Sequence, residues 1–115
     1  MDKGAFGEKL AVNYLEKSGY KIIFRNFRTK FAEIDIIAES RNQLVFFEVK
    51  YRTNKNFGRA EESVNVSKIS KIEKAAKFYI ERFYKGNRKS FRIDIIAINN
   101  FDTFEIKHYK NITGG

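Results

Sequence analysis

Two apolar segments with a short polar turn between them place the strongest constraint on how this chain can fold. Residues 32–38 and 44–51 are rich in β-branched and aromatic side chains, and residues 39–42 have the composition of a turn. Short runs of this type, separated by turn residues, are typical of paired strands. The pattern therefore predicts a β-hairpin.

Charged residues interrupt both apolar runs of the predicted hairpin. Glu33 and Asp35 lie in the first strand, and Glu48 and Lys50 lie in the second. Side chains two apart in a strand point to the same face, so each pair shares a face and the four groups can converge. A carboxylate within an apolar run is expected to be partly buried, which is unfavourable unless something of opposite charge binds it.

The chemistry of these groups suggests a metal site. Carboxylates of Asp35 and Glu48, on neighbouring strands, can hold a hard divalent cation such as Mg²⁺ and leave positions open for a phosphate oxygen and a water. Lys50 would lie beside the cation, where it can orient or help deprotonate the attacking water. The alternative is that Glu48 and Lys50 only form the polar face of a half-buried hairpin.

The charge balance favours a polyanionic partner. The chain has 23 Lys and Arg against 14 Asp and Glu, which gives a net charge of +9. Such an excess on a small domain fits nucleic acid, although a Lys-rich compositional bias would produce it too.

The chain has no cysteine, which excludes a disulfide framework and a thiolate site. Because no signal-peptide-like start or long apolar run is present, we expect a cytoplasmic protein without a membrane span.

The remaining sequence predicts helices on both sides of the hairpin and further strands. With 115 residues the chain is long enough for one core but not two, so we expect a single domain spanning residues 1–115. Periodicity and turn signals predict a helix over about 4–18 ending at Gly19, a strand over 20–28, a loop over 52–59, a helix over 67–85 ending at Gly86, and strands over 91–99 and 103–109. Sequential strands favour a meander, and a connection through a helix favours a crossover to a parallel strand.

Five basic residues near the acidic hairpin are candidates for binding nucleic-acid phosphates: Arg28, Lys30, Arg52, Arg59 and Lys68. The alternative for the first two is the solvated edge of a sheet, where basic residues discourage aggregation. Lysines along the second helix are usually a solvated face, but Lys68 opens that helix close to the predicted catalytic loop. Phe57 is either a residue that stacks on a base or an anchor that holds the loop on the core.

Three further titratable residues are given structural roles or none. Asp94 lies within an apolar strand, and we expect a buried ion pair with Arg92 or Arg52 in preference to metal binding. Glu8 lies on the apolar side of the first helix and points toward protein, where an ion pair with a nearby basic residue is the plainest interpretation. We assign His108 no role.

Asp35 followed by Glu48-Val49-Lys50 resembles the active-site signature of the PD-(D/E)xK nuclease superfamily. The wider set is similar to the YraN-like family of bacterial endonuclease-like proteins, which are similar to archaeal Holliday junction resolvases. It consists of Glu8, Leu10-Ala11, Gly19-Tyr20, Arg25-Asn26, Glu33-Ile34-Asp35-Ile36-Ile37, Phe47-Glu48-Val49-Lys50, Arg52, Lys68 and Arg92-Ile93-Asp94. The chain departs from the family pattern at Ala32, usually Gly, and at Tyr51, usually Thr.

The resemblance implies an α/β restriction-endonuclease-like sandwich, with a central mixed β-sheet flanked by helices. It also implies a metal-dependent DNA endonuclease, acting with Mg²⁺ or Mn²⁺ on branched DNA such as Holliday junctions and working as a homodimer. Asp35, Glu48 and Glu8 would be metal ligands, Lys50 would act at the water, and Glu33 would be a supporting acid. Two alternatives stay open: a basic nucleic-acid-binding module that keeps the fold without cleaving, and an accessory protein whose acids bind metal structurally.

Overall fold

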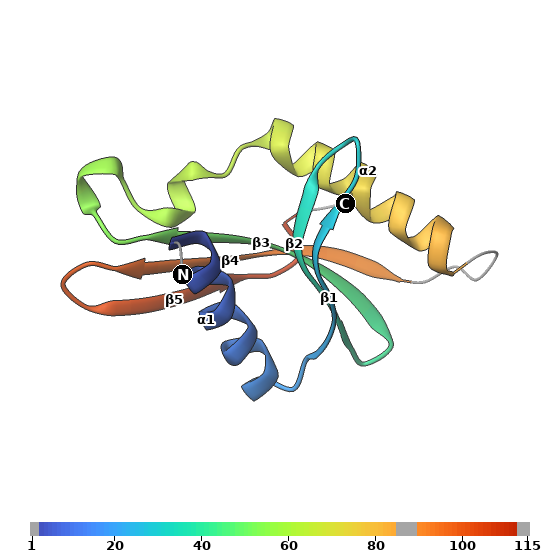
Figure 1. Cartoon of the computed structure of the whole chain (residues 1–115), viewed down its shortest axis with the longest axis horizontal. Helices are drawn as coiled ribbons and strands as arrows, with labels where there is room; N and C mark the ends of the chain where they lie inside the picture. Colours follow the sequence, from blue (N-terminus) through green and yellow to red (C-terminus); the bar gives the residue numbers. More distant parts are fainter. Residues whose placement is uncertain (1–2, 85–89, 113–115) are drawn as a thin grey trace.

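A computed structural model describes residues 3–84 and 90–112. Figure 1 shows a twisted β-sheet with a helix on each side. In chain order the elements are α1 (Lys3–Lys17), β1 (Lys21–Arg28), β2 (Glu33–Ser40), β3 (Gln43–Arg52), the 3₁₀ helices η1 (Lys55–Phe57) and η2 (Ala60–Ser63), α2 (Val66–Phe83), β4 (Phe91–Asn100) and β5 (Phe104–Tyr109). None of the helices in the described ranges is long and apolar enough to cross a membrane.

The sheet is mixed, and its strands follow the chain in the order β1-β2-β3-β4-β5. β1, β2 and β3 form an antiparallel meander, β4 runs parallel to β3, and β5 pairs antiparallel with β4. The parallel pair is connected through α2, as a crossover requires. The predicted hairpin, meander, crossover and α/β sandwich are therefore confirmed.

The core has two halves because β3, in the middle of the sheet, is covered on both faces. Phe46 packs with Ile72 and Tyr79 of α2, whereas Phe47 packs with Ala11 and Leu15 of α1. A strand buried on both sides reads as a continuous apolar run, as residues 44–47 do. Alternation beyond Phe47 then turns the side chains of residues 48 and 50 toward the α2 side of the sheet.

Two tight connections use left-handed backbone conformations. Gly19 has φ of 91° and ends α1, with the Tyr20 N–H donating back to the Leu15 carbonyl at 3.0 Å. Arg41 and Asn42, at φ of 52° and 66°, form the two-residue turn between β2 and β3, for which positive φ matches the twist of a hairpin. The predicted stop of the second helix, Gly86, lies outside the described residues.

The segment predicted as a loop over 52–59 is only partly a loop. β3 extends to Arg52, and residues 55–57 form η1, where the Asn54 side chain accepts a hydrogen bond from the Asn56 N–H. The following η2 was not predicted, because a single 3₁₀ turn is too short to show a hydrophobic period. The side chain of Phe57, a candidate for base stacking, lies outside the described part of the structure.

Candidate functional site

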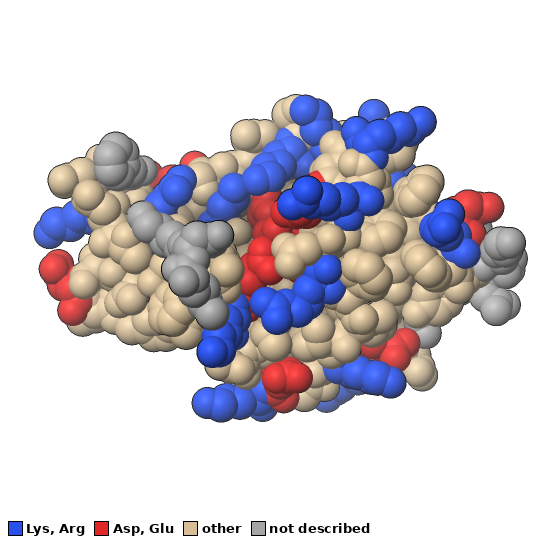
Figure 2. Space-filling view, in the orientation of Figure 1, with Lys and Arg blue, Asp and Glu red and all other residues tan. Residues whose placement is uncertain are grey.

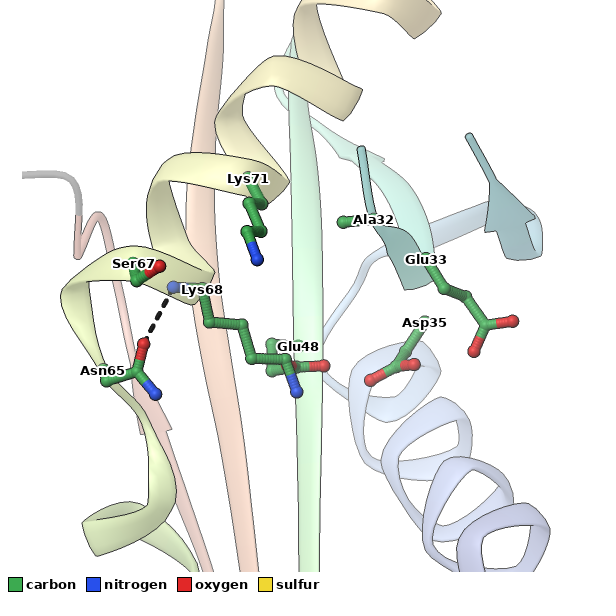
Figure 3. A pocket seen from close by; sticks show the side chains of 8 residues that line it. All are labelled: Ala32, Glu33, Asp35, Glu48, Asn65, Ser67, Lys68 and Lys71. Carbon is green, nitrogen blue, oxygen red and sulfur yellow. Dashed lines mark hydrogen bonds and ion pairs between the residues drawn. The ribbon is translucent and has the colours of Figure 1, made fainter. Parts of the chain in front are cut away.

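Three of the predicted acids, Glu33, Asp35 and Glu48, meet in a pocket of about 540 Å³ between the sheet and the beginning of α2. Its lining residues come from β2, β3, α2 and the segments that precede β2 and α2 (Figure 3): Ala32, Glu33, Asp35, Glu48, Asn65, Ser67, Lys68 and Lys71. On the face seen in Figure 2, acidic side chains form a strip near the middle, with Lys and Arg side chains on both sides. The hairpin thus brings together three acids that are close in sequence, and α2 adds lysines from a later segment.

Asp35 and Glu48 form the acidic centre of this pocket. Their side chains are hydrogen-bonding neighbours, and Asp35 Oδ2 also accepts a hydrogen bond from the Val49 N–H at 2.8 Å. Glu48 is only 4% exposed. Burial, followed by the hydrogen bond and the negative charge of Glu48, raises the pKa of Asp35 to about 8. Two carboxyl groups this close therefore retain a proton near neutral pH when no cation separates them.

Two lysines approach Glu48 from different elements. Lys68 Nζ of α2 lies 2.5 Å from Glu48 Oε2, and Lys50 Nζ of β3 lies 3.8 Å from the same oxygen. Burial and then the adjacent Lys68 lower the pKa of Lys50. Burial also disfavours the charged form of Lys68, but its close contacts with Glu48 and Lys50 outweigh this, so the pKa of Lys68 is raised. Lys68 therefore carries the charge that neutralises Glu48, while Lys50 is the more easily deprotonated amine.

The donor set fits a hard divalent cation. Asp35 and Glu48 offer carboxylate oxygens, and Glu48 Oε2 is buried yet accepts no hydrogen bond of favourable geometry within the described residues. Mg²⁺ is commonly held by one or two carboxylates while it keeps several waters and contacts substrate phosphates. In residues 3–84 and 90–112, no three acidic, His or Cys side chains gather into a ready metal site. The fit therefore rests on this pair of carboxylates.

Glu8 and Glu33 lie beside the acidic pair and have basic partners of their own. Glu8 on α1 forms an ion pair with Arg25 Nη2 at 3.8 Å, and its negative charge contributes to the raised pKa of Asp35. Glu33 accepts a hydrogen bond from Arg28 Nε at 2.6 Å, and Figure 3 shows its carboxylate on the far side of Asp35 from Glu48. The metal-binding role of Glu8 and the supporting role of Glu33 stay predictions.

The predicted phosphate-binding residues are placed differently from one another. Arg28 is 83% exposed in its pair with Glu33, and Lys30 Nζ lies 5.4 Å from the centroid of the Phe31 ring. Arg52 ends the strand that carries Glu48 and Lys50 and shares their face by alternation, and its buried Nε donates no hydrogen bond to the described residues.

Arg59 is bound by carboxylates away from the residues that line the pocket. Its side chain pairs with Glu61, with Nε 3.1 Å from Oε2, and with Glu105 of β5. Asn99 and Lys107 also bind Glu61, so this network joins η2 to the last two strands. The structure thus gives Arg59 a position in an ion-pair network, and its predicted contact with phosphate would require leaving two acids.

Three polar residues of the pocket were not identified from the sequence: Asn65, Ser67 and Lys71. Asn65 caps α2 by accepting a hydrogen bond from the Lys68 N–H at 2.8 Å, which fixes the helix start and hence the place of Lys68. The sequence did contain a signal for the Asn65 cap, since Asn directly before an amphipathic helix is a common N-cap. Lys71 follows Lys68 by one helical turn, but its position in a row of lysines made it look like part of a solvated face.

Asp94 lies outside the pocket, on the α1 side of the sheet. It is fully buried, accepts hydrogen bonds from Arg92 Nε at 3.0 Å and from the Asn111 N–H, and lies 2.7 Å from His108 Nε2. The predicted buried pair with Arg92 is therefore confirmed. His108, to which the sequence assigned no role, belongs to the same network and also contacts the Tyr14 hydroxyl.

We expect the stability of the metal-free protein to fall as pH rises between about 4 and 8, by on the order of 1 kcal/mol per pH unit. In this range the folded state keeps a proton on Asp35 that the unfolded chain, with a carboxyl pKa of 3.8, has already released. Asp35→Asn removes this titration, so the free energy of unfolding should change much less with pH. Urea unfolding in EDTA at several pH values measures both slopes. Parallel slopes for wild type and variant would contradict this assignment.

Comparison with known proteins places the chain in one family. Residues 7–98 match the model of the uncharacterised protein family UPF0102. The chain is 46% identical over 106 residues to a UPF0102 protein of Sulfurihydrogenibium sp., covering 92% of this chain and 91% of that protein. It is 48% identical over 107 residues to one of Persephonella marina, covering 92% and 90%. With one of Thermodesulfovibrio yellowstonii the identity is 46% over 111 residues, covering 96% and 95%. The chain therefore belongs to the UPF0102 family, and its resemblance to YraN-like proteins is confirmed.

Proposed function

We propose that this protein is a metal-dependent DNA endonuclease that hydrolyses phosphodiester bonds. The observation that carries the proposal is the pair of adjacent carboxyl groups, Asp35 and Glu48, in an open pocket with Lys50 beside Glu48. An acid pair of this kind, with Glu48 buried and Asp35 partly buried, destabilises a fold, as the raised pKa of Asp35 indicates. Such groups are kept where they serve a function.

Asp35 and Glu48 would hold the cation, each through a carboxylate oxygen. A bound Mg²⁺ or Mn²⁺ supplies positive charge that stabilises the phosphoryl oxygens in the transition state and makes bound water more acidic. Deprotonated Asp35 and Glu48 compensate that charge, which removes the repulsion between them. The Val49 N–H keeps Asp35 oriented through its hydrogen bond.

Lys50 would act on the attacking water. Its amine lies on the same face of β3 as Glu48, and its pKa is lowered by burial and by Lys68. A lysine that loses its proton more readily than usual can accept one from water, and in its charged form it can stabilise the oxygens of the phosphate.

The charge of the protein supports DNA as the substrate class. The net charge of +9 and the basic residues around the pocket favour the sugar-phosphate backbone, with contacts that position the duplex. Arg52 follows Lys50 on the same face of β3 and would contact a neighbouring phosphate. Recognition through backbone and shape is consistent with branched DNA such as a Holliday junction.

Cleavage of labelled DNAs tests the proposal. Single strands, duplexes, flaps and four-way junctions are incubated with Mg²⁺, Mn²⁺ or EDTA and with wild type, Asp35→Asn or Asp102→Asn. Asp102 is a matched control because its side chain is 84% exposed in the β4–β5 turn and pairs only with Lys55, at 3.6 Å, among the described residues. We expect metal-dependent cutting by wild type and Asp102→Asn and none by Asp35→Asn. Salt-dependent binding without cutting by wild type would identify a nucleic-acid-binding module instead.

A further inference from the structure

The lysines around the pocket are not equivalent. Lys68 and Lys50 both lie against Glu48, at 2.5 and 3.8 Å from its Oε2. Lys71 lines the same pocket, and Figure 3 shows its amine directed into it. Among the described residues Lys71 has no hydrogen bond or ion pair, so its positive charge faces the pocket without a compensating acid. The pocket therefore has one lysine that neutralises an acid and one that is available to an anion.

Lys68 takes the place on Glu48 that a divalent cation would need. Its ammonium contacts Oε2, the buried oxygen that accepts no favourable hydrogen bond from the described residues. Mg²⁺ binds a carboxylate oxygen at about 2.0–2.1 Å, so this cation and the ammonium would repel each other strongly if both contacted one oxygen. Binding of the cation to this oxygen of Glu48 therefore requires the ammonium of Lys68 to leave.

We propose that Lys68 is an internal competitor of the divalent cation, and that its displacement from Glu48 creates, together with Lys71, a binding subsite for a phosphate of the DNA backbone. This inference rests on the proposed function and extends it to the order in which the site is assembled. Before the cation binds, Lys68 satisfies Glu48. After the cation binds, Lys68 and Lys71 carry two positive charges that the acids no longer neutralise.

The local structure allows this exchange without movement of the helix. The Lys68 backbone is held by the hydrogen bond of its N–H to the Asn65 cap, while its side chain is 40% exposed and has four flexible carbons. Lys71 lies three residues further along α2, so both side chains project from the same side of the helix. A displaced Lys68 ammonium therefore stays near Lys71, where one phosphate can contact both.

The exchange predicts that cation and DNA each strengthen binding of the other. Without a cation, Lys68 is engaged by Glu48 and the phosphate loses one of its two contacts. With a cation, Lys68 is released, and by thermodynamic reciprocity DNA must raise the affinity for the cation by the same factor. Lys68→Met removes the competitor and the contact together, so it should tighten cation binding and abolish the mutual enhancement.

Two binding measurements test the inference without relying on cleavage. Calorimetric titration gives Mn²⁺ affinity at about pH 9, where protons compete least for the carboxylates. Fluorescence anisotropy gives the affinity for a labelled duplex with phosphorothioate linkages, which resist hydrolysis, in Mn²⁺ and in EDTA. The proteins are wild type, Lys68→Met, Lys68→Arg, which keeps the charge, and Lys71→Met, which removes a lysine of the same pocket that does not contact Glu48. Circular dichroism checks that each variant is folded.

We expect Lys68→Met to bind Mn²⁺ at least about tenfold more tightly than wild type, and Lys68→Arg and Lys71→Met to stay within about threefold. Mn²⁺ should strengthen DNA binding by wild type severalfold and leave DNA binding by Lys68→Met unchanged. Equal or weaker Mn²⁺ binding by Lys68→Met overturns the inference, and so does an enhancement of its DNA binding by Mn²⁺ as large as that of wild type.

If wild type cleaves DNA but Lys68→Met does not bind Mn²⁺ more tightly, only this inference fails. If wild type shows the coupling but cleaves nothing, only the proposed hydrolysis fails. Wild type that binds no Mn²⁺ overturns both.

Discussion

Replacing Lys50 with methionine should lower the rate of metal-dependent DNA cleavage by about 10²–10⁴-fold, the range lost when a general acid–base group is removed. Methionine keeps most of the length and apolar volume of the lysine stem, so the partly buried side chain can still pack on β3. The DNA substrate identified in the cleavage screen should bind with nearly unchanged affinity, because Lys68 and Lys71 still face the pocket. Single-turnover cleavage with saturating enzyme separates the chemical step from binding.

The matched control for this variant is Lys74→Met. Lys74 is an exposed residue of α2 outside the lining of the pocket, so its loss removes the same charge without touching the acids. Its cleavage rate should stay close to that of wild type. Because the pKa of Lys50 is lowered, the wild-type rate should also rise with pH up to that pKa, whereas Lys50→Met should lose this dependence. Equal losses in both variants would mean that net charge, and not the position of Lys50, limits the reaction.

Replacing Asp94 with alanine should lower the free energy of unfolding by about 3–5 kcal/mol, the cost of breaking a buried ion pair by removal of one partner. The variant leaves Arg92 and His108 without the carboxylate that they share, in a region where both side chains are largely buried. Urea unfolding at neutral pH measures the loss. Asp102→Ala, at an exposed turn, should change stability by less than about 0.5 kcal/mol.

The loss in Asp94→Ala should shrink in acid. Burial alone would raise the pKa of Asp94, but the contacts with His108, Arg92 and the Asn111 N–H outweigh it and lower the pKa. An acid with a lowered pKa in the folded state stabilises the protein above its unfolded pKa and ceases to do so as pH falls through the folded value. The difference between wild type and Asp94→Ala is therefore largest at pH 5 and above and decreases below about pH 4. A difference that stays constant down to pH 2 would contradict this interpretation.

The strands and helices of this fold could be predicted because they depend on local patterns. The apolar run before Glu48 indicates a strand covered on both faces, and the Arg41-Asn42 turn separates it from its antiparallel neighbour. The same alternation correctly places Glu48 and Lys50 on one face. Asp35 and Glu48 could be paired from the sequence for the same reason, since a hairpin brings its own two strands together.

Contacts between distant segments were not predictable in the same way. The approach of Lys68 to Glu48 depends on where α2 begins, and this is set by the Asn65 cap and by the η2 turn before it. The burial of His108 against Asp94 depends on the pairing of β5 with β4, which no local pattern of the short last strand specifies. The ion pairs of Arg59 with Glu61 and Glu105 likewise depend on the positions of η2 and β5.

The position of β3 in the sheet has a consequence for how the two sides of the pocket move. Glu48 directly follows the part of β3 that pairs with both β2 and β4, and it pairs with Ile95 of β4 itself, so amide hydrogen exchange in this strand should be among the slowest in the molecule. Lys68 and Lys71 lie in the first two turns of a helix whose start faces solvent. Local unfolding requires less free energy there, so amide hydrogen exchange is faster. The acidic side of the pocket is thus rigid, while the lysines on its basic side can shift to contact DNA backbones of different shape.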